Sequence, residues 1–338
     1  MCSCEALAEL YEGWWTLPLP DDEPLRSRSA LVEQDVLAAL DGLLWLRTGD
    51  AVAARLGISQ SSVSRVAGRC LRLFGIKGHK LDGEWDLIGD EPLLAAERRV
   101  HQIARWMGHR PLRLEATYWS GPLLYTPVPQ GWILGECNIV GVQRNWELLR
   151  TRIVDVWLSG LPDLPEADDP DLTSLTLSQM PVHCLVGEGH PLLDRPSLCV
   201  ADLAAFPSLA LPADAYPKVE RALRQLGLWS SPVRMKRYQR QLWEGKTEQE
   251  LTIGYGTALS LQLQGPAMHS LPLQLPIQSG EALVVRREFA HTPAFQQLAR
   301  TLHARLSQLA AGLPEIEVLP LDFSGSSGTA EAPPPPEP

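Results

Sequence analysis

The chain has 338 residues, of which 45% are hydrophobic and 21% charged, a composition typical of a globular protein with two or three folding units. Its apolar stretches end well short of the about 18 residues that a membrane span needs. Residues 1–5 lack the basic and apolar regions of a secretory signal, so we expect a cytoplasmic protein. The net charge of −10 argues against a nucleic-acid-binding protein that is basic throughout.

The six cysteines predict neither a disulfide framework nor a metal site. They lie at positions 2, 4, 70, 137, 184 and 199, and no second Cys or His pair lies near Cys2 and Cys4 to complete a zinc site. In a reducing compartment free thiols are expected. We therefore expect no metal and no cofactor.

Residues 1–30 are predicted to form an N-terminal extension. Three prolines between positions 18 and 24 oppose regular structure, so we expect an extended arm. From Leu31 the pattern changes, because apolar residues recur at helical spacing as far as Leu46. This pattern predicts a first helix that ends near residue 47.

Two more helices are predicted directly after it. Asp50 is expected to cap a helix over residues 51–56, which Gly57 would end. Ser59 is expected to cap a third helix, from about Gln60 to Leu73. Two helices joined by a short glycine-containing turn are the signature of a helix-turn-helix.

The third helix carries the residues that we expect to contact DNA. Val63, Ala67 and Cys70 share one face and are predicted to be buried, which leaves small hydroxyls, a glutamine and arginines outward. Residues 47–80 hold seven Arg or Lys and one acid, a local basic patch on an acidic protein. The alternative is an ordinary helical hairpin with a serine-rich cap. The candidate DNA-binding residues are Ser59, Gln60, Ser61, Ser62, Ser64, Arg65, Arg69, Arg72, Lys77 and Lys80.

A hairpin and a long helix follow. Residues 77–88 read as two strands with a turn at Asp82-Gly83, which would be a wing that completes a DNA-binding domain over residues 31–90. Residues 91–110 predict a linker helix, because acids and a proline precede an apolar stripe. A narrow stripe favours pairing with a second copy of the chain, although packing on its own domain is the alternative. The stripe is Leu93, Ala96, Val100, Ile103 and Met107.

The rest of the chain predicts a second domain over residues 111–313. Short apolar strands alternate with helices, which indicates an α/β domain with a mainly parallel sheet, split into two lobes. We expect lobe one at about 111–181 and 282–313, and lobe two at about 182–281. The proline-rich tail, residues 314–338, is predicted to be disordered. The strands are expected at 112–116, 132–142, 153–158, 182–186, 208–211, 251–253 and 282–285.

Four segments resemble the LysR-type transcriptional regulators. Residues 59–64, Ser-Gln-Ser-Ser-Val-Ser, are similar to that family's recognition helix, and residues 187–192 contain its His-Pro-Leu. Residues 153–158 look like its Asp-containing strand, and residues 254–259 like its Gly-x-Gly turn. In order and spacing the resemblance covers about residues 31–312. Arg152 departs from the usual glycine, and residues 77–80 depart from the usual wing sequence.

This resemblance implies a fold and a function. The fold would be an all-α winged helix-turn-helix, a linker helix and an α/β two-lobed periplasmic-binding-protein-like domain. The protein would bind double-stranded DNA as a homodimer or homotetramer, with no membrane partner. A small, anionic effector would bind between the lobes and alter promoter binding. The expected effector-binding residues are Thr117, Tyr118, Trp119, Ser120, Asp214, Gly254, Tyr255, Gly256 and Thr257.

Enzymatic activity is not expected, and no catalytic residue is predicted. Gly254-x-Gly256 is too short for a dinucleotide fingerprint, and neither a Gly-x-Ser-x-Gly nor a Walker sequence occurs. His183 and Cys184 are adjacent in a predicted strand, so their side chains point to opposite faces. The alternative function is an α/β solute-binding or enzymatic domain whose degenerate helix-turn-helix serves interactions.

Overall fold

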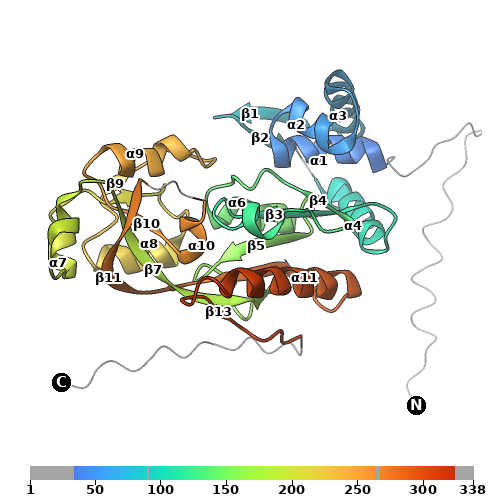
Figure 1. Cartoon of the computed structure of the whole chain (residues 1–338). Coiled ribbons are helices and arrows are strands. Elements are labelled where there is room, and N and C mark those ends of the chain that lie inside the picture. The colour runs from blue at the N-terminus through green and yellow to red at the C-terminus, as the bar shows by residue number, and fades with distance from the viewer. Residues whose placement is uncertain (1–33, 90, 264–266, 324–338) are drawn as a thin grey trace, which may run out of the picture. The chain divides into compact units, whose positions relative to one another are not determined.

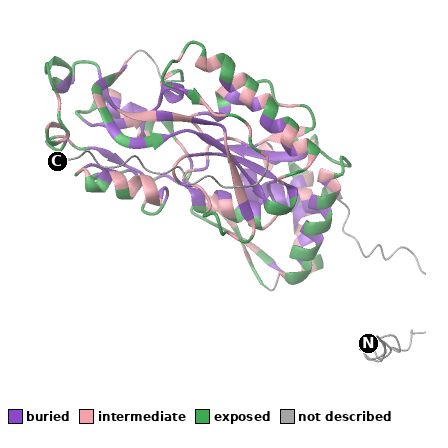
Figure 2. Ribbon diagram, turned by 90° about the horizontal axis from the view of Figure 1, so that it is seen from below, coloured by how far each residue is buried: buried purple, intermediate pink, exposed green. Residues whose placement is uncertain are grey.

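The computed structural model describes residues 34–89, 91–263 and 267–323 of the chain (Figure 1). The predicted N-terminal arm and residues 324–338 of the predicted tail lie outside the described residues. Buried residues gather in the strands, whereas the helices carry exposed residues on their outer faces (Figure 2). No helix among the described residues is long and apolar enough to cross a membrane.

Three helices and a hairpin form the N-terminal domain. Thr48 caps the second helix by accepting the Ala51 N–H at 3.2 Å, so the predicted cap at Asp50 is wrong by two residues. Gly57 ends that helix with a φ of 67°, and Ser59 caps the third helix, both as predicted. The elements are α1 (Gln34–Leu46), α2 (Gly49–Leu56), α3 (Gln60–Phe74), β1 (Lys77–Leu81) and β2 (Glu84–Ile88).

The wing forms where the sequence predicts it. Strands β1 and β2 are antiparallel, and Leu81 pairs with Glu84 across a two-residue turn. Both turn residues have positive φ, 51° at Asp82 and 83° at Gly83, which is the backbone that matches the twist of a tight hairpin.

The linker helix α4 (Pro92–Trp106) packs on the rest of the chain with its polar face inward. Glu97, Arg98, Gln102 and Arg105 are buried. The stripe itself is exposed at Leu93, Val100, Ile103 and Met107. The alternative that the stripe packs on its own domain is therefore wrong.

Lobe one is built on a five-stranded sheet in the order β4-β3-β5-β12-β6. β3 is parallel to β4 and β5, but β12 is antiparallel to β5 and β6, so the prediction of a mainly parallel sheet is wrong. The chain enters β12 from lobe two, and this strand therefore runs opposite to its neighbours β5 and β6. The elements are β3 (Leu112–Ala116), α5 (Gly121–Leu124), β4 (Trp132–Leu134), α6 (Val142–Arg150), β5 (Val156–Gly160), β6 (Leu172–Thr176), β12 (Glu281–Arg286) and α11 (Pro293–Ala310).

Lobe two is built on an antiparallel sheet in the order β10-β7-β11. Strand β7 begins directly after β6 of lobe one, and β11 ends directly before β12 of lobe one. These two long strands therefore connect the lobes. The predicted strand at 251–253 is wrong, because residue 253 makes only an isolated bridge and the strand is β10. The elements are β7 (Ser178–Gly187), α7 (Val200–Leu203), β8 (Leu209–Ala210), α8 (Pro217–Gln225), β9 (Ser231–Pro232), α9 (Glu244–Gln249), β10 (Gly254–Gly256), α10 (Ala258–Leu261) and β11 (Met268–Ser279).

The prediction of disorder from residue 314 is wrong for residues 314–323. Strand β13 (Glu317–Val318) pairs with β7, and the Leu319 carbonyl lies 2.9 Å from His303 Nε2 on α11. Ile316 is buried in the core beneath that helix. These contacts hold residues 316–319 against β7 and α11.

Candidate functional site

The exposed end of α3 is the first candidate site. Val63 and Cys70 are fully buried and hold the helix on its domain, and Ala67 is nearly so. Ser59, Gln60, Ser61, Ser64 and Arg65 are exposed, and Ser62 is half-buried. A row of small hydroxyls with a glutamine and an arginine allows close approach to a groove and presents hydrogen-bond donors to it.

Two of the predicted serines have structural roles in the turn before α3. The Ser59 hydroxyl accepts the Ser62 N–H at 3.3 Å, which caps the helix. The hydroxyls of Ser59 and Ser62 lie 2.8 Å apart, and Arg65 donates to Ser62 at 3.2 Å. The Ser61 hydroxyl takes part in the same network, at 3.2 Å from that of Ser59.

Five of the seven basic residues in the 47–80 segment remain outward. Arg65, Arg69, Arg72, Lys77 and Lys80 are exposed, and Lys80 Nζ lies 5.9 Å from the Trp85 ring centroid. The other two basic residues have partners within the chain: exposed Arg55 contacts lobe one, and half-buried Arg47 contacts the wing. Arg55 donates to the Leu134 carbonyl at 2.8 Å, and Arg47 lies 3.6 Å from the Glu84 carboxylate.

A pocket of about 320 Å³ between the two lobes is the second candidate site. Tyr118 of lobe one stacks on Tyr238 of lobe two, with ring centroids 3.9 Å apart and planes within 6°. Trp119 packs against Tyr216 across the same gap, with centroids 5.9 Å apart. The aromatic lining consists of Tyr118, Trp119, Tyr216, Trp229, Tyr238, Trp243 and Tyr255.

The structure brings five of the nine predicted effector-binding residues to this pocket. Its lining includes Tyr118, Trp119, Tyr255, Gly256 and Thr257. Thr257 also caps α10, since its hydroxyl accepts the Ser260 N–H at 3.3 Å.

The other four predicted residues do not line it. The hydroxyls of Thr117 and Ser120 are buried and lie 2.6 Å apart, so they bind each other inside lobe one. Asp214 is exposed and borders a different cavity, beside the wing. At Gly254 the Thr247 side chain lies 2.8 Å from where a Cβ would stand, so this glycine allows close packing.

The sequence prediction missed the polar groups of the pocket. Glu244 is buried and accepts a short hydrogen bond from the Tyr238 hydroxyl. Burial raises the pKa of Glu244, which favours its uncharged form. Arg240 is exposed at the rim and forms an ion pair with Glu248. Five aromatic residues lie between positions 216 and 255, but the sequence does not show that their side chains point into one pocket.

Glu281 lies behind Trp119, where β11 passes into β12. The Trp119 indole N–H donates to it at 3.3 Å, and its second oxygen has no partner among the described residues. Burial raises its pKa to about 7, against smaller opposing effects of hydrogen bonds from Ser120 and Trp119. The carboxyl group thus holds Trp119 in place from beneath the pocket.

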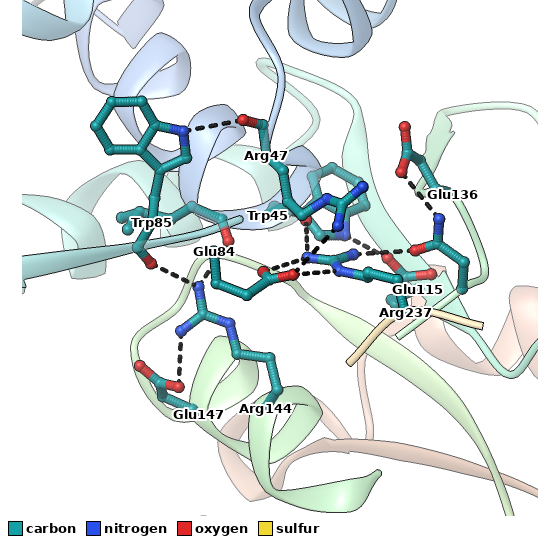
Figure 3. Close-up of polar contacts among 11 residues, drawn as sticks. Trp45, Arg47, Glu84, Trp85, Glu115, Glu136, Arg144, Glu147 and Arg237 are labelled. Carbon is teal, nitrogen blue, oxygen red and sulfur yellow. Dashed lines mark hydrogen bonds and ion pairs between the residues drawn. The ribbon is translucent and has the colours of Figure 1, made fainter. Parts of the chain in front are cut away.

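The N-terminal domain contacts both lobes through polar side chains (Figure 3). On lobe one, Trp45 Nε1 donates to Glu115 at 2.6 Å, and Asp41 lies 3.2 Å from Arg113. On the lobe-two side, Arg237 forms two parallel hydrogen bonds with the Glu84 carboxylate of the wing, at 2.9 and 2.8 Å. No group of acidic, His and Cys side chains able to hold a metal occurs among the residues that the structure describes.

Comparison with known proteins gives a consistent result. Residues 138–307 match the LysR substrate binding domain family. A full-length OxyR variant from Pseudomonas aeruginosa is 17% identical, with 80% of this chain and 94% of that chain covered and a TM-score of 0.51. A probable transcriptional regulator, PA0477, from the same organism is 16% identical, with 80% and 96% covered and a TM-score of 0.51. No curated protein sequence matches the chain significantly.

Proposed function

The chain belongs to the LysR-type transcriptional regulators, and we propose that it binds DNA through α3 and senses a planar, largely apolar effector between its lobes. The exposed row of Gln60, Ser61, Ser64 and Arg65 on a helix seated by buried residues carries the DNA-binding assignment. Family membership removes the support for the alternative of a solute-binding or enzymatic domain with a degenerate helix-turn-helix. The chain is a regulator and not an enzyme.

The proposed effector class follows from the pocket lining. Seven aromatic side chains offer flat apolar surfaces, which suit a planar ligand. Glu244 and Tyr238 supply a hydrogen-bonding pair at one side. The sequence predicts an anionic effector, but the one cation in the described lining of the pocket is Arg240. This side chain is exposed and already paired with Glu248. This lining supports an uncharged aromatic compound over a carboxylate.

We also propose that α4 pairs with a second copy of the chain. Leu93 and Met107 are 66% and 70% exposed, and Val100 and Ile103 between them are 48% and 39% exposed. An apolar stripe at this spacing, left open while the polar face is buried, supports an interface with another copy. A cytoplasmic location is proposed because the DNA partner lies there.

DNA selection with the full chain tests this function. The purified protein is incubated with a random duplex library, and bound sequences are recovered at two salt concentrations. We expect enrichment of a partly palindromic site, as two copies present two α3 helices. Arg65→Ala should weaken binding to that site by roughly 1–3 kcal/mol where the contact is base-specific.

Arg300→Ala is the matched control, because Arg300 is an exposed arginine on α11. It removes the same charge from the chain and should bind DNA like the parent. If no sequence is enriched, or if both variants bind alike, the assignment of α3 is overturned.

A further inference from the structure

Arg237 occupies a junction of three parts of the molecule (Figure 3). Its guanidinium group holds the Glu84 carboxylate of the wing by two parallel bonds and donates to the Trp45 carbonyl of α1 at 3.1 Å. A further bond, of 3.0 Å, joins it to the Asn138 side chain. The side chain of Arg237 is 5% exposed, so these bonds are shielded from water. Bidentate arginine–carboxylate pairs of this kind are among the strongest polar contacts in proteins.

The electrostatics around Glu84 favour the charged pair. Burial alone would raise the pKa of Glu84, but the hydrogen bonds and charge of Arg237, with help from Arg47 and Arg144, lower it below its ordinary value. Arg144 of lobe one adds to the same surface by donating to the Trp85 carbonyl at 3.3 Å. The wing is therefore held beside its turn by arginines from both lobes.

The residue next to Arg237 reaches into the pocket. Tyr238 stacks on Tyr118 and donates to Glu244, so its ring forms part of the lining. Its backbone N–H donates to the Asn138 carbonyl at 2.6 Å, which fixes the segment against lobe one. In an extended segment, neighbouring side chains point in opposite directions. Arg237 thus faces the wing while Tyr238 faces the pocket.

We propose that Arg237 and Tyr238 form a latch through which the occupant of the pocket controls the wing. A planar ligand that takes the place of the Tyr118–Tyr238 stack displaces Tyr238, and the shift of this short segment weakens the grip of Arg237 on Glu84. The latch rests on the proposed effector pocket but not on DNA binding. The ion pair of Asp41 on α1 with Arg113 of lobe one does not involve this segment and keeps the domain attached when the latch opens.

Hydrogen exchange of the wing amides in the full chain, without DNA or ligand, tests the latch. Arg237→Ala should speed exchange in β1 and β2 by roughly tenfold or more, because local opening no longer breaks a shielded ion pair. Glu84→Gln should also speed exchange in β1 and β2, because it removes the carboxylate charge that Arg237 holds while keeping the shape of the side chain. Lys236→Ala is the matched control, since its pair with Asp82 is exposed and worth little.

The coupling to the pocket has its own variant. Tyr118→Ala removes the stacking partner of Tyr238 without touching the wing, and it should also speed exchange in β1 and β2. Tyr255→Phe, on another wall of the pocket, should leave the wing unchanged. Exchange in β5 and β12 reports whether each variant stays folded.

Two outcomes overturn the proposal. Parent-like wing exchange in Arg237→Ala with a folded core would show that the pair does not hold the wing. Parent-like wing exchange in Tyr118→Ala would show that the pocket and the wing are not coupled. Neither measurement involves DNA, so failure of the latch and failure of the DNA-binding assignment are separately observed.

Discussion

The two faces of α4 differ in a way that inverts the usual amphipathic helix. The inner face is polar and buried: Arg105 forms an ion pair with Asp155 at 2.8 Å, and Gln102 donates to the same carboxylate at 3.0 Å. The outer face is apolar and exposed along its length. A helix normally turns its apolar stripe to its own core. Here the polar face fixes the helix to lobe one, and the apolar face is left exposed.

The largest expected effect is on the inner face. Arg105→Ala would leave Asp155, which is fully buried, without its charged partner. Removing one member of a buried pair typically costs about 3–5 kcal/mol of the free energy of unfolding. Chemical denaturation of the full chain measures this loss. Arg99→Ala, an exposed arginine on the same helix, is the control and should change stability by less than about 0.5 kcal/mol. Equal stability of the two variants would mean that the inner face does not fix the helix.

The outer face should affect assembly rather than folding. Replacing Val100 and Ile103 by Asp would place like charges against each other across a symmetric interface, so the oligomer should dissociate. Because both side chains are exposed within one copy, the thermal stability of the dissociated chain should change little. Sedimentation at several concentrations measures the species present. An oligomer that persists in the double variant would place the interface elsewhere.

A smaller effect is expected at the edge of the inner face. Arg152 donates to the Gln102 side chain at 2.7 Å and pairs with Glu288, whose carboxylate is partly exposed. Arg152→Ala should therefore cost only about 0.5–1.5 kcal/mol, as for a single hydrogen bond. Denaturation under the conditions used for Arg105→Ala gives the comparison. A loss as large as that of Arg105→Ala would show that the edge is as important as the centre.

The sequence was informative wherever the signal lay within one element. The stripe of α4, the cap at Ser59 and the buried face of α3 all follow from spacing over a few residues. It failed where partners come from distant segments. Strand β3 alternates apolar and polar residues, which favours one solvent-exposed face. Arg113 and Glu115 on that face are nevertheless buried, because Asp41 and Trp45 of α1 bind them.

The pocket shows the same limit. Tyr118 and Trp119 could be predicted because they follow a strand, but the residues opposite them come from segments about 100 or more positions away. Thr117 and Ser120 offered the expected hydroxyl groups, yet they turn inward because each satisfies the other. Direction at a loop depends on such pairings, and one sequence does not reveal them.

Among the described residues, each of the three parts of the molecule contains one buried cysteine. Cys70 lies in the N-terminal domain, Cys137 in lobe one and Cys184 in lobe two, whereas Cys199 is exposed. Burial raises the thiol pKa of Cys70 and of Cys184 to about 12 and that of Cys137 also upward, so none of the three reacts readily while folded. With Cys2, Cys4 and Cys199 replaced by serine, each remaining thiol would report by alkylation when its own part of the chain opens. The rates of alkylation of the three thiols would therefore show the order in which the N-terminal domain, lobe one and lobe two open.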